Sequence, residues 1–295
     1  MMDKKNKTVV ASVSLAMVAL VWGTSYAIIK DTLDIIEPFT LMTIRFVGAV
    51  IFLGLIYIKK LIKVKVEDLR AGFTIGLALF ASFFTLIMGI QHTNVSKQSF
   101  LVGSFVIMVP FLRWFINKKK PDIYAIIGAT AALVGLAMLT LGGIDGINKG
   151  DVYSLFCALF FALHMITIEK YCNNSDPIIL SIIQFAVTAA IFMILSYKFE
   201  NFDFSVIKNA KFSIAYLVFV STIIGFVAQN IIQKYISATS TALILALESV
   251  FGSIFAVYYL DEKMSLTMIF ACIIIFLGII TQETKWTFIK NYRKF

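Results

Sequence analysis

Three ionisable side chains lie inside long apolar runs of this sequence, namely Arg45, His164 and Glu248. Glu248 is about ten residues from either end of its run, which places it near the middle of a bilayer if the run crosses one. A charge at that depth costs about 2.5–3.5 kcal/mol on insertion scales, so the side chain should face a cavity or a partner. We expect Glu248 to bind a cation or ammonium group, or to accept a proton. The alternative is a structural pair or hydrogen bond with a neighbouring helix.

Arg45 and His164 each fit two roles. Arg45 lies about one and a half turns into its run, where a guanidinium group can clamp helices together or pair with a carboxylate. We therefore expect a structural charge, with snorkelling towards the surface as the alternative. His164 carries the side chain that titrates nearest to neutral pH. It fits a contact with a proton or a substrate as well as it fits a hydrogen bond between helices.

Aromatic and uncharged polar residues complete the predicted site. Trp22 and Tyr26 are four residues apart and share one face of a helix, and aromatic faces attract cations and stack on planar solutes. The alternative for both is ordinary packing. Gln229 and Asn230 can form hydrogen bonds with a substrate or between helices. The predicted substrate-binding residues are Trp22, Ser25, Tyr26, His164, Gln229, Asn230 and Glu248.

The sequence lacks the motifs of several common metal, nucleotide and redox sites. Only two histidines occur and no HExxH is present, so no familiar zinc site is predicted. The sequence contains no GxxxxGK[ST] nucleotide-binding loop, and no cofactor is expected. The cysteines have no CxxC spacing and are expected to be small, reduced core residues; they are Cys157, Cys172 and Cys272.

Composition indicates a membrane protein whose helices position these residues. Apolar residues make up 60% and charged residues 15% of the 295, with a mean hydropathy of +0.90. A helix needs about 20 apolar residues to cross a bilayer. We predict an all-α integral membrane protein with transmembrane helices near residues 9–29, 39–58, 69–90, 96–116, 123–141, 152–169, 178–197, 212–233, 238–260 and 265–282.

The basic residues predict the orientation of these helices. Lys and Arg total 26, and the net charge is +9. They form short clusters between apolar runs, which disfavours nucleic acid as a partner. Most of them fall on the side of the amino terminus, and such loops stay in the cytoplasm. We therefore predict a multi-pass protein of the cytoplasmic (inner) membrane, with both termini cytoplasmic and a basic tail at 284–295.

A repeat is visible in the spacing of polar and proline residues. Two triplets share a constant offset of 139 positions, namely Lys30, Pro38 and Arg45, and Glu169, Pro177 and Gln184. A second register, offset by 143, pairs Val95 with Ala238 and Gly135 with Gly278. Each half, 9–143 and 150–283, would hold five helices, and an odd number inverts the second half. Inverted halves around a central cavity are typical of alternating-access transporters.

The same segments resemble the EamA branch of the drug/metabolite transporter superfamily over nearly the whole chain. The resemblance is carried by Trp22-Gly23 with Ser25-Tyr26, by Pro38 with Arg45-Phe46, and by "SKQSFLVGSFVIMVPFL" and "ISATSTALILALESVFGSIFAVYYLDE". One departure is Ser249, which stands where the family often has proline and so leaves open a kink in the ninth helix. The resemblance implies a basket-like bundle and the export or exchange of metabolites such as amino acids.

A secondary transporter is therefore the favoured function, with a small-molecule substrate, the lipid bilayer and proton coupling as its partners. It could act as a monomer or a homodimer. A channel or receptor is the alternative, but a channel favours rings of charge along its pore. An intramembrane enzyme would need a convergent catalytic set, and every Asp lies in or beside a loop. No enzymatic activity is predicted.

Overall fold

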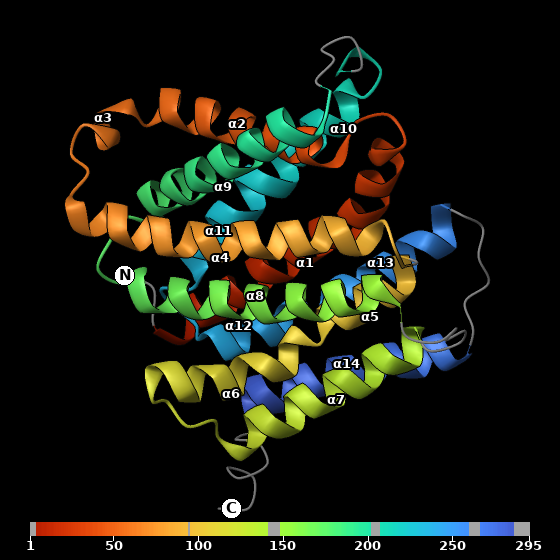
Figure 1. The fold of residues 1–295 in the computed structure, drawn as a ribbon. Coiled ribbons are helices and arrows are strands. Elements are labelled where there is room, and N and C mark those ends of the chain that lie inside the picture. Colours follow the sequence, from red (N-terminus) through yellow and green to blue (C-terminus); the bar gives the residue numbers. More distant parts are fainter. Residues whose placement is uncertain (1–3, 94, 141–147, 202–206, 260–265, 286–295) are drawn as a thin grey trace, which may run out of the picture.

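The computed structural model describes residues 4–93, 95–140, 148–201, 207–259 and 266–285. It is an all-helical bundle (Figure 1). Seven of the described helical segments are long and apolar enough to cross a membrane, and three shorter apolar helices accompany them, at Ile123–Met138, Ala238–Gly252 and Ile269–Thr284. The ten predicted helices are therefore confirmed. The basic tail beyond residue 285 lies outside the described residues.

Each half of the chain supplies one five-span set. The first half contains α1 (Lys4–Leu33), α2 (Pro38–Ile56), α3 (Ile58–Leu61), α4 (Val66–Ile90), α5 (Val95–Gly103), α6 (Phe105–Asn117) and α7 (Ile123–Thr140). The second contains α8 (Lys149–Tyr171), α9 (Pro177–Phe199), α10 (Lys211–Ala215), the π-helix η3 (Tyr216–Ile224), α11 (Gly225–Ile232), α12 (Ala238–Leu245), α13 (Leu247–Tyr259) and α14 (Leu266–Thr284).

Equivalent helices of the two halves begin in the same way. Pro38 and Pro177 open α2 and α9 at the first helical position, where the missing proline N–H would have had no helical partner. The Asp176 carboxylate caps α9 by accepting a hydrogen bond from the backbone N–H of Ile178 at 2.8 Å. The prolines that marked the repeat in the sequence therefore mark the same helix start in both halves.

The largest helix contacts join one half to the other. Four pairs of helices are in extensive contact, namely α7 with α14, α4 with α8, α2 with α9, and α4 with α9. The first span of each half also contacts the second part of the fourth span in the other half. These contacts are α1 with α13 and α8 with α6. The two sets of five are therefore interleaved and do not form separate domains side by side (Figure 1).

Two spans are interrupted at equivalent positions. The fourth span breaks at Ser104, between α5 and α6, and the ninth breaks at Ala246, between α12 and α13. In both cases one backbone N–H is shared by the carbonyl groups three and four residues earlier, which tightens the helix locally. The ninth span is thus interrupted although the residue after Glu248 is Ser249 and not a proline. The break lies just before Glu248.

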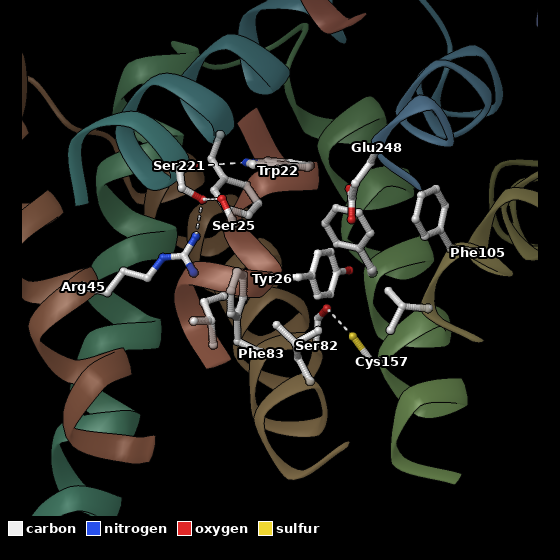
Figure 2. A pocket seen from close by; sticks show the side chains of 15 residues that line it. Trp22, Ser25, Tyr26, Arg45, Ser82, Phe83, Phe105, Cys157, Ser221 and Glu248 are labelled. Carbon is white, nitrogen blue, oxygen red and sulfur yellow. Dashed lines mark hydrogen bonds between the residues drawn. The ribbon is translucent and has the colours of Figure 1, made fainter. Parts of the chain in front are cut away.

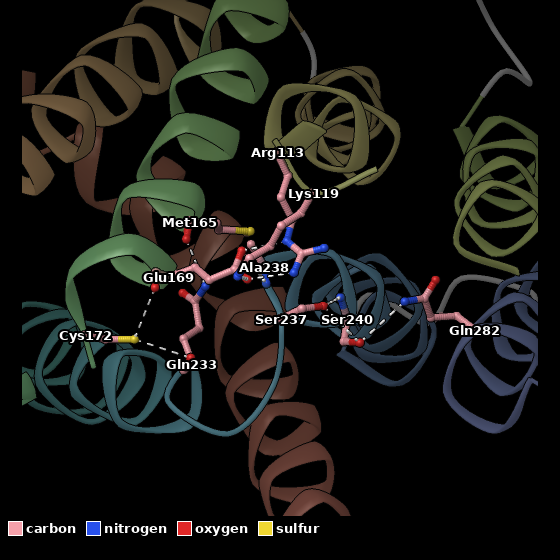
Figure 3. A network of polar contacts seen from close by, with 10 residues as sticks. All are labelled: Arg113, Lys119, Met165, Glu169, Cys172, Gln233, Ser237, Ala238, Ser240 and Gln282. Atoms are coloured by element: carbon pink, nitrogen blue, oxygen red, sulfur yellow. Dashed lines mark hydrogen bonds and ion pairs between the residues drawn. The ribbon is translucent and has the colours of Figure 1, made fainter. Parts of the chain in front are cut away.

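Polar contacts tie the halves at the bundle end where α1 begins. Glu169, near the end of α8, receives two hydrogen bonds from Arg113 of α6, at 2.7 and 2.8 Å (Figure 3). The same carboxylate lies 3.5 Å from Lys119 Nζ and accepts a bond from the backbone N–H of Ala238, the first residue of α12. This inner tie, as we call the contacts of Glu169 with Arg113, Lys119 and Ala238, connects three spans.

Candidate functional site

A pocket lies in the middle of the bundle, between the two halves (Figure 2). Its interior measures about 60 Å³, counted as the space open to the centre of a water-sized sphere, which is room for several water molecules. Its aromatic wall is formed by Trp22, Tyr26, Phe83, Phe105, Phe161 and Phe226. An equal number of lining residues have polar or ionisable side chains, namely Ser25, Arg45, Ser82, Cys157, Ser221 and Glu248, and the aliphatic Ile29, Leu86 and Val102 complete the lining.

Glu248 reaches the pocket from the first turn of α13. The residue is 8% exposed, and its carboxylate interacts with the hydroxyl group of Tyr26, which points towards it (Figure 2). Among the ion pairs of the described residues, none includes Glu248. The interruption at Ala246 sets this turn at the start of a new helix, where a negative charge is favourable. The geometry offers a carboxylate to a cationic group in the pocket.

Glu248 comes close to α1 because α1 has a glycine at the contact. A Cβ atom on Gly23 would lie 2.5 Å from the backbone oxygen of Glu248 and 2.9 Å from the backbone nitrogen of Gly252. Only a residue without a side chain fits between these two backbones. Gly23 therefore allows α13 to bring Glu248 beside Tyr26.

Arg45 is anchored by the π-helix η3 on another side of the pocket. Its Nη2 donates to Ser221 Oγ at 2.9 Å, and its Nε donates to Thr222 Oγ1. Ser221 Oγ also accepts a bond from Ser25 at 2.9 Å, and the Ser221 carbonyl accepts one from Trp22 Nε1 at 2.9 Å. Segments of π-helix often occur at functional sites. Here the segment presents both polar groups of one serine to three pocket side chains.

The aromatic wall is a continuous set of ring contacts. Trp22 lies edge to face with Phe161 at 5.8 Å between ring centroids and tilted against Phe226 at 4.7 Å. Phe161 in turn contacts Phe105 at 5.3 Å. Such pairs add about 0.5–1.5 kcal/mol each beyond area burial. The wall is thus a packed surface that can accept an apolar group of a ligand.

The pocket follows the duplicated register of the sequence. Four pairs of pocket or near-pocket residues are 139 positions apart (for example 161 − 22): Trp22 and Phe161, Ser25 and His164, Arg45 and Gln184, and Ser82 and Ser221. Ser25 and Arg45 of the first half both contact Ser221 of the second half. Their counterparts His164 and Gln184 contact each other, with Nε2 and Oε1 2.9 Å apart. The scaffold is duplicated, but only one of the two clusters carries a charge.

Of the predicted site residues, Trp22, Ser25, Tyr26 and Glu248 line the pocket, together with Arg45, which was predicted to be a structural charge. The others are buried beside it. His164 is packed between Phe161 and Phe226. Gln229 donates to Gln233 Oε1 at 3.2 Å, and Asn230 donates to Ser181 Oγ at 2.7 Å. His164 and Asn230 therefore bond to a neighbouring helix, which was one of the two roles predicted for each, whereas Gln229 bonds to the residue that ends its own helix.

Sequence reasoning missed several residues of the pocket. Phe83, Phe226 and Ser82 lie in spans whose composition gives no sign of a cavity, and Ser221 depends on the π-helix. One signal was present for the serines, because Ser82 and Ser221 share the 139 offset with the predicted residues. Within the described residues, no three His, Cys, Asp or Glu side chains gather in a way that could hold a metal ion.

Comparison with known proteins identifies relatives over the whole bundle. The model of the EamA-like transporter family matches the chain twice, at residues 10–141 and 148–281, which agrees with the duplication. An uncharacterized transporter of Archaeoglobus fulgidus is 32% identical over 277 residues, covering 93% of this chain and 86% of the relative. The uncharacterized transporter YoaV of Bacillus subtilis is 23% identical, covering 89% and 92%.

Two more distant matches are a named efflux pump and a solved structure of similar fold. A probable amino-acid metabolite efflux pump of Salmonella typhimurium is 23% identical over 222 residues, covering 71% of this chain and 73% of the relative. A crystal structure with 15% sequence identity matches with a TM-score of 0.76 and covers 93% of this chain and 97% of its own. That structure supports the fold alone.

Proposed function

The chain belongs to the EamA-like transporter family, and from this premise we propose that it moves small amphipathic or cationic metabolites, amino acids among them, across the cytoplasmic membrane by alternating access. The observation that carries the proposal is the central pocket. It combines an aromatic wall with a buried Glu248 carboxylate for which no ion pair is found among the described residues.

Glu248 would bind the cationic group of the substrate. A desolvated carboxylate gains most from a partner of opposite charge that is also a hydrogen-bond donor, such as an ammonium group. Trp22 and Tyr26 would accept the remainder of the cation through their ring faces. The same carboxyl group could bind a proton when the substrate leaves, which would couple transport to the proton gradient.

Alternating access would use the two inverted halves as the moving parts. The pocket lies where the halves meet, as expected for inverted repeats. The inner tie of Glu169 joins Arg113 of the first half to two helices of the second. We infer that this tie closes the pocket towards the amino-terminal side and must break when the protein opens there.

The remaining predictions define the setting of the pocket. We propose halves at 9–143 and 150–283, a basic cytoplasmic tail at 284–295, both termini in the cytoplasm, and a monomer or homodimer as the working unit. The relative from Salmonella typhimurium, a probable amino-acid metabolite efflux pump, supports amino acids as substrates and export as the direction. These features rest on the proposed transport function.

The direct test is efflux from proteoliposomes. Vesicles containing the purified protein are loaded with labelled L-leucine, L-lysine and 3-methylbutylamine, and release is compared with protein-free vesicles. Wild-type protein should release at least one of these compounds, and Glu248→Gln should slow that release by about tenfold to 100-fold, the value of a charge-assisted contact. Glu67→Gln, at the exposed start of α4, is the matched control and should change nothing.

Two outcomes would overturn parts of the proposal. Wild-type vesicles that release none of the three compounds would exclude these substrate classes. Release that is unchanged by Glu248→Gln, with the same dependence on pH, would remove Glu248 from the mechanism.

A further inference from the structure

Arg45 has a buried positive charge without an anionic partner among the residues that the structure describes. Its side chain is 2% exposed, and the ion pairs of described residues involve other cations. Taking a charge out of water without a counter-charge costs several kcal/mol. An anion supplied from outside the chain would therefore stabilise this side chain.

The guanidinium group is held in place with donors to spare. Nε and Nη2 bind Thr222 and Ser221, and the group lies over the Phe83 ring, 4.8 Å from its centroid. Nη1 is buried and has no hydrogen-bond partner. Since a guanidinium group offers five N–H donors in a planar fork, the free edge has the geometry for a two-point contact with a carboxylate.

The residue that carries this donor lines the same pocket as Glu248. Both Arg45 and Glu248 line it, and Figure 2 shows them on opposite sides, with Tyr26 between them. Two opposite charges that line one cavity without forming an ion pair present a dipolar environment. A ligand with a negative and a positive group would satisfy both charges, and its apolar part would contact the aromatic wall.

We propose that Arg45 is an anion subsite of the pocket and binds the carboxylate of a zwitterionic substrate whose ammonium group is bound by Glu248. This inference rests on the proposed transport function and narrows its substrate class to α-amino acids with an apolar side chain. Ser221 and Thr222 act as positioning residues that fix the guanidinium plane. The sequence predicted that Arg45 is a structural clamp between helices. Such a clamp would use the same two hydroxyl groups but would leave Nη1 without a hydrogen-bond partner.

The test uses three ligands of nearly equal shape that differ in charge. L-leucine carries both groups, 3-methylbutylamine lacks the carboxylate and 4-methylpentanoate lacks the ammonium group. Binding to the purified full-length protein in nanodiscs is measured by calorimetry. Wild-type protein should bind leucine about tenfold to 100-fold more tightly than either analogue, because each analogue loses one charge-assisted contact.

Two variants then assign each contact to its residue. Arg45→Gln should reduce the affinity for leucine by about that factor and leave the affinity for 3-methylbutylamine unchanged. Glu248→Gln should reduce the affinities for leucine and 3-methylbutylamine and leave that for 4-methylpentanoate unchanged. Arg45→Lys, which keeps the charge but loses the planar fork, should recover only part of the leucine affinity. If Arg45→Gln does not fold, Ser221→Ala supplies the test, because it removes an anchor of the guanidinium group and should reduce the preference for leucine over 3-methylbutylamine.

The outcomes separate this inference from the proposed function. Equal affinity of wild-type protein for leucine and 3-methylbutylamine, both sensitive to Glu248→Gln, would overturn the anion subsite and leave a cation transporter standing. Equal losses for all three ligands in Arg45→Gln would show a purely structural arginine. If Arg45→Gln leaves the affinity for leucine unchanged and the melting temperature of the wild-type protein depends on chloride, the guanidinium group binds a free anion. That result would overturn the proposal that it binds the carboxylate of a zwitterionic substrate. If the protein binds none of the three ligands and releases none of the three compounds in the efflux test, both proposals are rejected.

Discussion

Gly23 of α1 lies directly against the backbone carbonyl of Glu248 in α13. A Cβ atom at Gly23 would be 2.5 Å from that oxygen, and neither backbone can yield without moving a helix. The contact joins the first span of one half to the ninth span in the other half, and it sets how far Glu248 reaches into the pocket. The position of the candidate binding carboxylate therefore depends on the absence of a side chain one helix away.

A methyl group at Gly23 should be poorly tolerated. Gly23→Ala is expected to lower the free energy of unfolding by about 1–3 kcal/mol, the cost of forcing extra volume into a packed site, and to slow leucine efflux because Glu248 is displaced. The matched control is Gly54→Ala in α2, where the nearest atom to the new Cβ is Leu61 Cδ1 at 3.9 Å. The free energy of unfolding of that variant should rise by up to about 1 kcal/mol, because alanine has a higher helix propensity than glycine. Melting experiments that rank the two variants equally would contradict the close contact.

Breaking the inner tie should open the pocket from the amino-terminal side. Glu169→Gln removes the charge that binds Arg113 and Lys119, and losing one partner of a buried ion pair costs more than the ~1.4 kcal/mol that shifts an equilibrium tenfold. In a background with Cys172 and Cys272 replaced by serine, the pocket thiol Cys157 should react about tenfold faster with a membrane-impermeant thiol reagent added on that side.

Sidedness and a second ion pair control this measurement. Global unfolding would speed the reaction of Cys157 from both sides of the membrane, whereas opening at the tie speeds it from one side only. Lys60→Gln breaks a more exposed pair with Asp176, with side chains 42% and 39% exposed, and should leave the rate unchanged because such pairs contribute little. An unchanged rate in Glu169→Gln would exclude the tie as a gate.

The Lys60–Asp176 pair should contribute a small, acid-sensitive part of the stability. Burial by itself would raise the pKa of the Asp176 carboxyl, but the hydrogen bonds from Lys60 and from the backbone N–H of Ile178 outweigh it, so its pKa lies below the ordinary value. A lowered folded-state pKa gives stability that is present above the unfolded-state pKa, about 3.9, and is lost as the pH falls through the folded-state pKa.

The comparison that checks this is the melting temperature of wild-type protein and Asp176→Asn between pH 6 and pH 3. The wild type should be the more stable at pH 6, by less than about 1 kcal/mol because the pair is exposed, and the gap should narrow towards pH 3. Asp122, whose pKa is likewise lowered by its bond with Lys285 against the effect of burial, should behave in the same way on substitution by asparagine. A gap that stays constant or widens in acid would refute the assignment.

The architecture was predictable because its signals are local or periodic. Apolar runs of bilayer length gave the helices, and Pro38 and Pro177 at equal spacing gave the duplicated start of α2 and α9. Arg45 and Glu248 stood out because charges are costly in such runs. The free edge of Arg45 could not be predicted, since it depends on Ser221 and Thr222 from a distant π-helix.

The interruptions of the fourth and ninth spans were hidden for a different reason. Neither Ser104 nor Ala246 is a residue that breaks helices by itself, so propensity gives no warning. His164 shows the opposite limit, because one histidine in an apolar run fits a ligand contact and an interhelical bond equally well. Its contact with Gln184 arises because α8 and α9 both pack on α4, which a single sequence does not reveal.

The interleaving of the two sets of helices has a consequence for how such a chain could arise. Because α2 packs on α9, α4 on α8 and α7 on α14, either half alone would turn its small and polar faces towards hydrocarbon. A five-span ancestor could bury those faces only against a second copy inserted upside down in the same membrane. Fusion of the two copies would then have allowed each to diverge. One trace of that divergence is that the equivalent positions 45 and 184 hold an arginine in the first half and a glutamine in the second.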